Sequence, residues 1–293
     1  MANKRILVRR RKSVRNIRKI TRTMQLIATA RFQAAFKRAI ASKPYTEKLA
    51  ELVSSLSSGS ESIDHPLLEP REEANTSVLL VISSNRGLCG GYNTNVLRTA
   101  LRRLDELAKE GADTEVHMIG RKGAGYFKFL GRPVARETLD ISDKPQFADI
   151  EPMADALMER FVKGEIASVQ VAYMRFISAG KQVATVMPLL PLTPEDGEDE
   201  TSQAAGPRVE FEYSPEPMAL LDELLPATVR VRLFQCFIEA TVSEQIARMV
   251  AMKAATDAAD DMITALTRKY NRARQTQITM ELLDIIGGVN ALA

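Results

Sequence analysis

Residues 227–286 read ATVRVRLFQCFIEATVSEQIARMVAMKAATDAADDMITALTRKYNRARQTQITMELLDII and contain neither glycine nor proline. Sixty residues without a helix breaker predict one continuous helix. At 1.5 Å per residue such a helix is roughly 90 Å long, about three times the diameter of a small domain. We therefore expect this helix to extend beyond any globule that the same chain forms.

Apolar residues recur along this stretch with the 3-4 spacing of a coiled coil. Ten of the thirteen positions in the two series are apolar or aromatic. A period of 3.5 residues calls for a supercoiled partner helix. The first series is Ile238, Gln245, Met252, Ala259, Leu266, Ala273 and Met280, and the second is Val242, Met249, Thr256, Ile263, Tyr270 and Gln277.

Residues 1–43, which also lack glycine and proline, offer that partner. Small side chains such as Ala28, Ala34 and Ala35 would let a second helix approach closely. Because the two segments lie at opposite ends of the chain, an antiparallel two-helix coiled coil is the favoured interpretation. Two independent amphipathic helices on the middle domain are the alternative, since periods of 3.5 and 3.6 are hard to separate in short runs. The N-terminal series is Val14, Ile17, Thr21, Met24, Ala28, Arg31 and Ala35.

The middle of the chain alternates between strand and helix patterns and predicts a small Rossmann-like α/β domain, mostly parallel with one antiparallel edge. Strands are expected at 77–83, 115–119, 168–177 and 182–190, and helices at 93–109, 123–130 and 150–162. The expected domains are residues 1–58 and 216–293 for the two coiled-coil helices, and 74–213 for the α/β domain, with an acidic loop at 193–207.

Charge and composition limit the function classes. The 293 residues are 45% hydrophobic and carry a net charge of +3, yet residues 1–46 hold fourteen Lys and Arg and no acid. That distribution keeps a basic coiled-coil adaptor for nucleic acid open as an alternative. An organellar transit peptide is disfavoured, because the apolar stripe continues past Met24. The two cysteines suggest neither a disulfide framework nor a zinc site, and no apolar run is long enough for a membrane span.

One glycine-rich turn, residues 85–93 (NRGLCGGYN), follows a strand and precedes a helix. Nucleotide-binding folds hold phosphate at this place, which leaves a nucleotide-binding enzyme using the glycine-rich turn 86–91 as a second alternative. The turn lacks the dinucleotide spacing and the Gly-Lys-Ser/Thr of a P-loop, so glycines serving a tight turn are favoured. His65, His117 and Cys89 have no partner at ligand or catalytic spacing. No catalytic residue, cofactor or metal site is predicted.

Four stretches together resemble the gamma subunit family of F-type ATP synthases. Residues 243–257 (SEQIARMVAMKAATD) and 270–290 (YNRARQTQITMELLDIIGGVN) are similar to its two C-terminal hallmark stretches. Residues 13–24 (SVRNIRKITRTM) resemble its basic N-terminal motif, and residues 84–93 its SDRGLCGGxN turn. Asn85 departs from the usual Asp, which puts a carboxylate role at the turn in doubt. Gly288 and Asn290 depart from the pattern near the C-terminal end.

The resemblance implies a non-catalytic central-stalk rotor that couples proton-driven rotation to conformational change at the catalytic sites of the beta subunits. The implied partners are three alpha and three beta subunits, the epsilon subunit and the c-subunit ring, on the cytoplasmic face of a bacterial inner membrane. The implied coupling residues are Met24, Arg248, Arg274, Gln275, Thr279 and Glu281. A bearing tip of Leu282, Leu283, Ile285, Ile286 and Val289 is also implied. Saturable nucleotide binding or steeply salt-dependent DNA binding by the chain would favour the alternatives.

Overall fold

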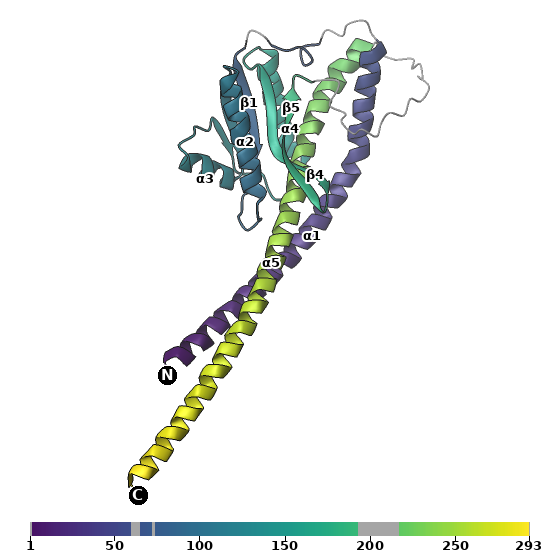
Figure 1. Ribbon diagram of the computed structural model, residues 1–293. Helices are drawn as coiled ribbons and strands as arrows, with labels where there is room; N and C mark the ends of the chain where they lie inside the picture. The colour runs from purple at the N-terminus through teal and green to yellow at the C-terminus, as the bar shows by residue number, and fades with distance from the viewer. Residues whose placement is uncertain (1, 60–64, 72–73, 193–216, 293) are drawn as a thin grey trace. The chain divides into compact units, whose positions relative to one another are not determined.

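The computed structural model describes residues 2–59, 65–71, 74–192 and 217–292. The expected acidic loop, residues 193–207, lies outside the described residues. Figure 1 shows the elements along the chain. They are α1 (Ala2–Gly59), β1 (Thr76–Ile82), α2 (Tyr92–Lys109), β2 (Asp113–Ile119), α3 (Arg121–Phe129), β3 (Arg136–Thr138), α4 (Phe147–Val162), β4 (Ser168–Ser178), β5 (Lys181–Leu190) and α5 (Pro217–Leu292).

The five strands form one sheet in the order β3-β2-β1-β4-β5. β1 pairs in parallel with β2 and with β4, and β2 pairs in parallel with β3, whereas β4 and β5 form an antiparallel hairpin. The expected parallel sheet with an antiparallel edge is confirmed. Strand β3 was not expected, because its three residues, Arg-Glu-Thr, carry no apolar alternation.

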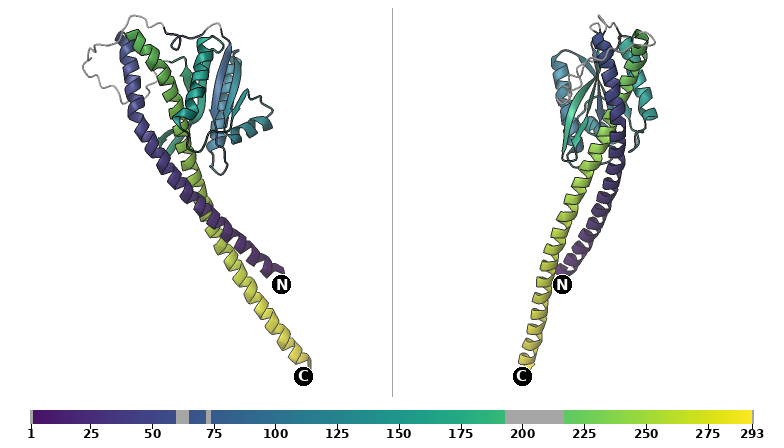
Figure 2. Two further views of the ribbon diagram at one scale, coloured as in Figure 1. Left: turned by 180° about the vertical axis from the view of Figure 1, so that it is seen from behind. Right: turned by 90° about the vertical axis from the view of Figure 1, so that its right-hand side faces the viewer.

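Helices cover both faces of the sheet, as the two orientations in Figures 1 and 2 show. Val78, Leu80 and Ile82 of β1 pack on one face with apolar residues of α4 and the first part of α5. Leu79 and Val81 point to the other face, toward α2 and α3. A strand buried on both faces reads as a continuous apolar run, which is why β1 could be recognised from its sequence.

The chain divides into two compact units. The globular unit comprises residues 31–247 and contains the whole sheet. The helical unit comprises Met1–Ala30 and Arg248–Ala293, the N-terminal part of α1 and the C-terminal part of α5. Both long helices therefore contribute to both units.

Within the helical unit the two helices are antiparallel. Thr21 Oγ1 and Thr256 Oγ1 lie 2.8 Å apart, and Arg18 Nη1 lies 2.8 Å from Asp260 Oδ1. Further along, the Arg11 guanidinium stacks over the Tyr270 ring at 4.9 Å. Residue numbers fall on α5 as they rise on α1, so the expected antiparallel coiled coil is confirmed, and two independently lying helices are not found.

Fewer residues of α1 are buried along the contact line between the two helices, here called the seam, than the heptad spacing predicted. Val14, Thr21 and Ala28 are buried, but Ile17, which was expected between them, is 52% exposed. Two packed helices touch along a narrow strip of each surface. On α1 the small side chains of Thr21 and Ala28 lie in that strip. In the globular unit Ala35 continues the buried series and packs against Ile238, Val242 and Ile246 of α5.

Both long helices contain residues that ordinarily end a helix. Pro44 lies inside α1, and α5 begins before Pro226 and continues through Gly287 and Gly288. A proline in a helix interior costs about 3 kcal/mol. At Pro226 that cost is offset by packing, because Leu225 and Val229 beside it are fully buried in the globular core. The helix α5 (Pro217–Leu292) therefore extends past the glycine- and proline-free stretch 227–286 at both ends.

Candidate functional site

The carboxyl ends of β1 and β2 meet at the glycine-rich turn, the place where an α/β fold would hold a phosphate. The Asn85 side chain joins three loops here: its Nδ2 donates to the Ile141 carbonyl at 3.0 Å, and its Oδ1 accepts from the Arg121 amide at 3.2 Å. An aspartate could not make the first of these bonds. The departure at Asn85 thus supplies a donor to the loop that follows β3.

The amides at the start of α3 are already bonded to protein groups. Besides the Arg121 amide, the Lys122 amide donates to the Ser84 carbonyl at 3.1 Å and the Gly123 amide donates to Ser83 Oγ at 2.9 Å. Gly120 has a φ of 91°, and a Cβ at this position would lie 2.3 Å from the Ser83 carbonyl oxygen. The glycine is therefore required by the close approach of two loops, and the first amides of α3 are taken up by protein acceptors.

The cavity at this edge is small. It has a volume of about 40 Å³ and lies between the strand ends and α5, with Ser83, Asn85 and Thr241 among its lining residues. A buried water needs roughly 10–15 Å³ of such volume, so the cavity has room for a few waters and not for a nucleotide. The geometry favours a structural role for the turn.

The turn is also tied to α1 through one carboxylate. Asp143 accepts a hydrogen bond from Arg31 of α1, and the Arg86 Nη2 atom of the turn lies 3.3 Å from the same carboxylate oxygen. Two residues after Arg86, Leu88 has a φ of 63° and is 61% exposed. A leucine in the left-handed region is uncommon, and here the backbone presents an apolar side chain to the surroundings.

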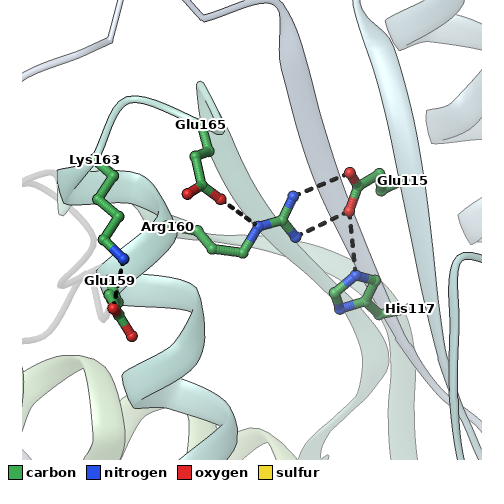
Figure 3. A network of polar contacts seen from close by, with 6 residues as sticks. All are labelled: Glu115, His117, Glu159, Arg160, Lys163 and Glu165. Carbon is green, nitrogen blue, oxygen red and sulfur yellow. Dashed lines mark hydrogen bonds and ion pairs between the residues drawn. The ribbon is translucent and has the colours of Figure 1, made fainter.

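A polar network on the α4 side of the sheet joins β2 to α4, as Figure 3 shows. Arg160 of α4 makes two parallel bonds to the Glu115 carboxylate, at 2.9 and 3.0 Å, and His117 Nε2 lies 3.5 Å from Glu115 Oε2. The hydrogen bonds from Arg160 lower the pKa of the Glu115 carboxyl, and burial lowers the pKa of His117. This network holds secondary structure together.

Sequence reasoning assigned His117 no partner, because only ligand and catalytic spacings were compared. Residues two apart on a strand share a face, so Glu115 and His117 could have been paired from the strand period alone. The arginine that completes the network is 45 residues away in sequence. Nothing in the sequence pattern points to Arg160.

The expected coupling residues fall into two groups, all within the helical unit. The first group is Met24 of α1, which is half-buried, and Arg248 of α5, which is 7% exposed. The other four lie on the exposed C-terminal part of α5, where Glu281 accepts a bond from Gln277 Nε2 at 2.6 Å. These exposed residues are Arg274, Gln275, Thr279 and Glu281.

Beyond that point α5 continues past the beginning of α1, as both views of Figure 2 show. A concavity of about 330 Å³, lined by Lys4, Arg5, Val8 and Gln277, marks the place where the seam ends. The expected tip residues Leu282, Leu283, Ile285, Ile286 and Val289 are between 50% and 66% exposed. Five large apolar side chains on more than one face of a helix form an exposed hydrophobic patch, which is typical of an interaction surface.

The described residues contain neither a metal-binding cluster nor a membrane-spanning helix. No group of three or more His, Cys, Asp or Glu side chains in the described part of the chain could hold a metal ion. Within the same ranges no helix combines the length and the apolar character needed to cross a membrane. The two cysteines, Cys89 and Cys236, are both free and buried.

Comparison with known proteins gives a consistent result. The sequence model of the ATP synthase family matches residues 3–292. The ATP synthase gamma chain of Rhodopirellula baltica is 46% identical over all of this chain and 99% of its own length. That of Leptospira biflexa is 40% identical over the full length of both chains.

Solved structures show a similar fold. A chain of the Euglena gracilis mitochondrial ATP synthase, from the OSCP/F1/c-ring in rotational state 3, matches with a TM-score of 0.67 and 20% identity. The match covers 99% of this chain and 95% of that one. A family match over nearly the whole chain and full-length relatives above 30% identity lead to one conclusion: this protein belongs to the ATP synthase gamma chain family.

Proposed function

We propose that this chain is the central-stalk rotor subunit of an F-type ATP synthase and couples proton-driven rotation to conformational change at the catalytic sites. The observation that supports this most is α5, a 76-residue helix whose last turns are exposed on every side. A helix that ends in exposed apolar side chains needs a surrounding partner. A ring of three alpha and three beta subunits supplies one.

The asymmetry of the helical unit would let rotation change the conformation of each beta subunit in turn. Basic residues are concentrated on α1, and α5 alone continues beyond the seam. A shaft with different faces presents a different surface to each beta subunit as it turns. Differential contacts of this kind are what shift a subunit between states of different nucleotide affinity.

Individual residues take different parts in this mechanism. Met24 and Arg248 adjust the fit between the paired helices and the loops that pass them. The exposed Arg274, Gln275, Thr279 and Glu281 make hydrogen bonds and ion pairs with moving loops of the beta subunits. The tip residues Leu282, Leu283, Ile285, Ile286 and Val289 turn in an apolar collar, where non-directional contacts resist rotation least.

The chain takes part in catalysis without catalytic residues or a cofactor of its own. Support comes from the cavity at the strand ends beside the glycine-rich turn, which at about 40 Å³ is too small for a nucleotide. Residues 74–213 would carry the contacts with the epsilon subunit and the c ring. Residues 1–58 and 216–293 would form the shaft. Membrane contact on the cytoplasmic face of the bacterial inner membrane comes through these partners.

Co-purification tests this function directly. A tagged copy of the chain, isolated from its native membrane after mild detergent extraction, is expected to bring down two kinds of nucleotide-binding subunit. Quantitative mass spectrometry should give one copy of the chain for three of each. A stable complex of another stoichiometry, or recovery of the chain alone, would contradict the rotor proposal.

A further inference from the structure

Strand β4 has one backbone edge without a partner strand near its C-terminal end. β1 pairs with β4 only as far as Ala172, whereas β4 itself continues to Ser178 along β5. The backbone groups of Met174 and Phe176 lie two residues apart and so point to the same edge of the strand. Unpaired backbone groups inside a fold require other partners.

Two side chains of α5 occupy this edge. The Phe176 amide donates to Glu239 Oε2 at 3.2 Å, and Ser243 Oγ donates to the Met174 carbonyl at 3.2 Å. Glu239 and Ser243 are four residues apart, so they lie on one face of the helix, one turn from each other. Ser243 is 1% exposed, and Glu239 Oε1 accepts a second bond from Gln235 Nε2 at 3.1 Å.

The same strand also contacts the other long helix. The Phe176 ring packs edge-on against Phe36 of α1, with ring centroids 5.7 Å apart. Ala35, Ile238, Val242 and Ile246 form the apolar cluster beside it. Phe176 therefore touches both helices of the shaft, α5 through its backbone amide and α1 through its ring.

Hydrogen bonds at this place do something that apolar packing cannot. Apolar contacts are non-directional and tolerate a small roll of one helix against its neighbour. Hydrogen bonds weaken steeply with misalignment. Two of them, one helical turn apart and directed at one rigid strand, oppose rotation of α5 about its own axis.

We propose that Glu239 and Ser243 form a torsional clamp that transmits torque between the α/β sheet and α5. This inference rests on the proposed rotor function and names the positioning residues through which the globular unit would drive the helix. The clamp lies wholly within the globular unit, and α5 continues from it without a break to Leu292. It touches no nucleotide and no reacting group.

The test is a measurement of torsional stiffness in the assembled complex. The catalytic ring is fixed to a surface, a probe is attached to the globular unit, and the spread of probe angles is recorded while the enzyme is stalled. The double variant Glu239→Ala, Ser243→Ala is expected to raise the angular variance about twofold, because both directional contacts are lost. ATP hydrolysis without load should stay near the wild-type rate.

Thr241→Val is the matched control. Its hydroxyl lies on α5 between the two clamp residues and donates to the Phe237 carbonyl of the same helix at 2.8 Å. Loss of this hydroxyl should leave the angular variance unchanged. A control that broadens the distribution as much as the double variant would point to a general weakening of α5 and would overturn the proposal.

The remaining outcomes are also decisive. An unchanged angular variance in the double variant refutes the clamp. If the double variant does not assemble, Ser243→Ala alone is measured and judged by the same two criteria, since it removes one hydroxyl and little volume. If the probe on the wild-type complex does not rotate when ATP is added, the rotor proposal itself fails. That result is distinct from failure of the clamp.

Discussion

At the residue scale, the buried polar groups of this chain stabilise its fold. His65 and His117 are each 7% exposed, and each lies 3.5 Å from an acid, Asp222 and Glu115 respectively. Burial nevertheless lowers the pKa of both histidines, so the fold favours the neutral imidazole. The two histidines are therefore among the groups that make the stability of this fold depend on pH.

The contribution of the two histidines to the free energy of unfolding should fall as the pH is lowered from 7.5 to 5.5. The unfolded chain takes up protons at both histidines near pH 6.5, whereas the fold resists protonation, so the unfolded state binds more protons. Each histidine contributes at most about 1.4 kcal/mol per pH unit. Urea unfolding of His117→Gln at both pH values should show a smaller dependence than wild type. An identical dependence would contradict the assignment.

Met24→Lys is expected to reduce coupling without preventing assembly. Met24 is half-buried in the helical unit, and an ammonium there costs several kcal/mol unless it reaches water or a carboxylate. An acidic loop of a beta subunit would supply that carboxylate and hold the rotor at one angle. ATP hydrolysis and proton pumping, measured in the same membrane vesicles, should therefore show less pumping per ATP. An equal fall in both rates would indicate a folding role instead.

At the element scale, periodicity was the most informative property of the sequence. The series that ends at Gln277 was recognised from spacing alone. Val242 and Thr256 in it are buried, and its other four members are half-buried. Ile17 was wrongly expected in the helix contact, because heptad spacing does not show how many residues per turn the partner helix covers. Strand β3 was missed because its three residues carry no apolar pattern and pairing with β2 decides it.

Close helix approach at Ala28 can be tested by enlarging its side chain. Ala28 is completely buried, so Ala28→Leu should lower the free energy of unfolding by about 1–3 kcal/mol through overpacking. Ala30→Leu is the control, because Ala30 is exposed on the same helix. Thermal unfolding should separate the two variants clearly. Equal melting temperatures would show that the helices are not held closely at this position.

At the scale of the whole molecule, the residues alone predicted architecture better than function. Two long stretches without glycine or proline indicated two long helices. The alternation of strand and helix patterns in the middle of the chain indicated the sheet. The coupling roles proposed for Arg274 and Thr279 were predicted only through resemblance, because an exposed residue on a helix has no pattern that separates it from ordinary surface. The Glu239 and Ser243 contacts join β4 to α5 across more than sixty residues, and no local signal reveals them.

The purified chain should not bind ATP tightly. The cavity at the strand ends is about 40 Å³, and the amides at the start of α3 donate to protein acceptors. Calorimetric titration with ATP and magnesium is expected to give no heat that saturates in the micromolar range. Micromolar affinity would mean that the turn opens to admit a nucleotide and would favour the enzyme alternative.

The bare end of α5 also has a consequence for the life of the protein in the cell. Leu282, Leu283 and Ile285 are each more than half exposed, and under the rotor proposal a newly made copy would carry them before any ring forms around it. Such a surface invites self-association and recognition by chaperones and proteases. Orphan copies are therefore expected to be short-lived, and the abundance of the chain would follow the supply of its ring rather than its own rate of synthesis.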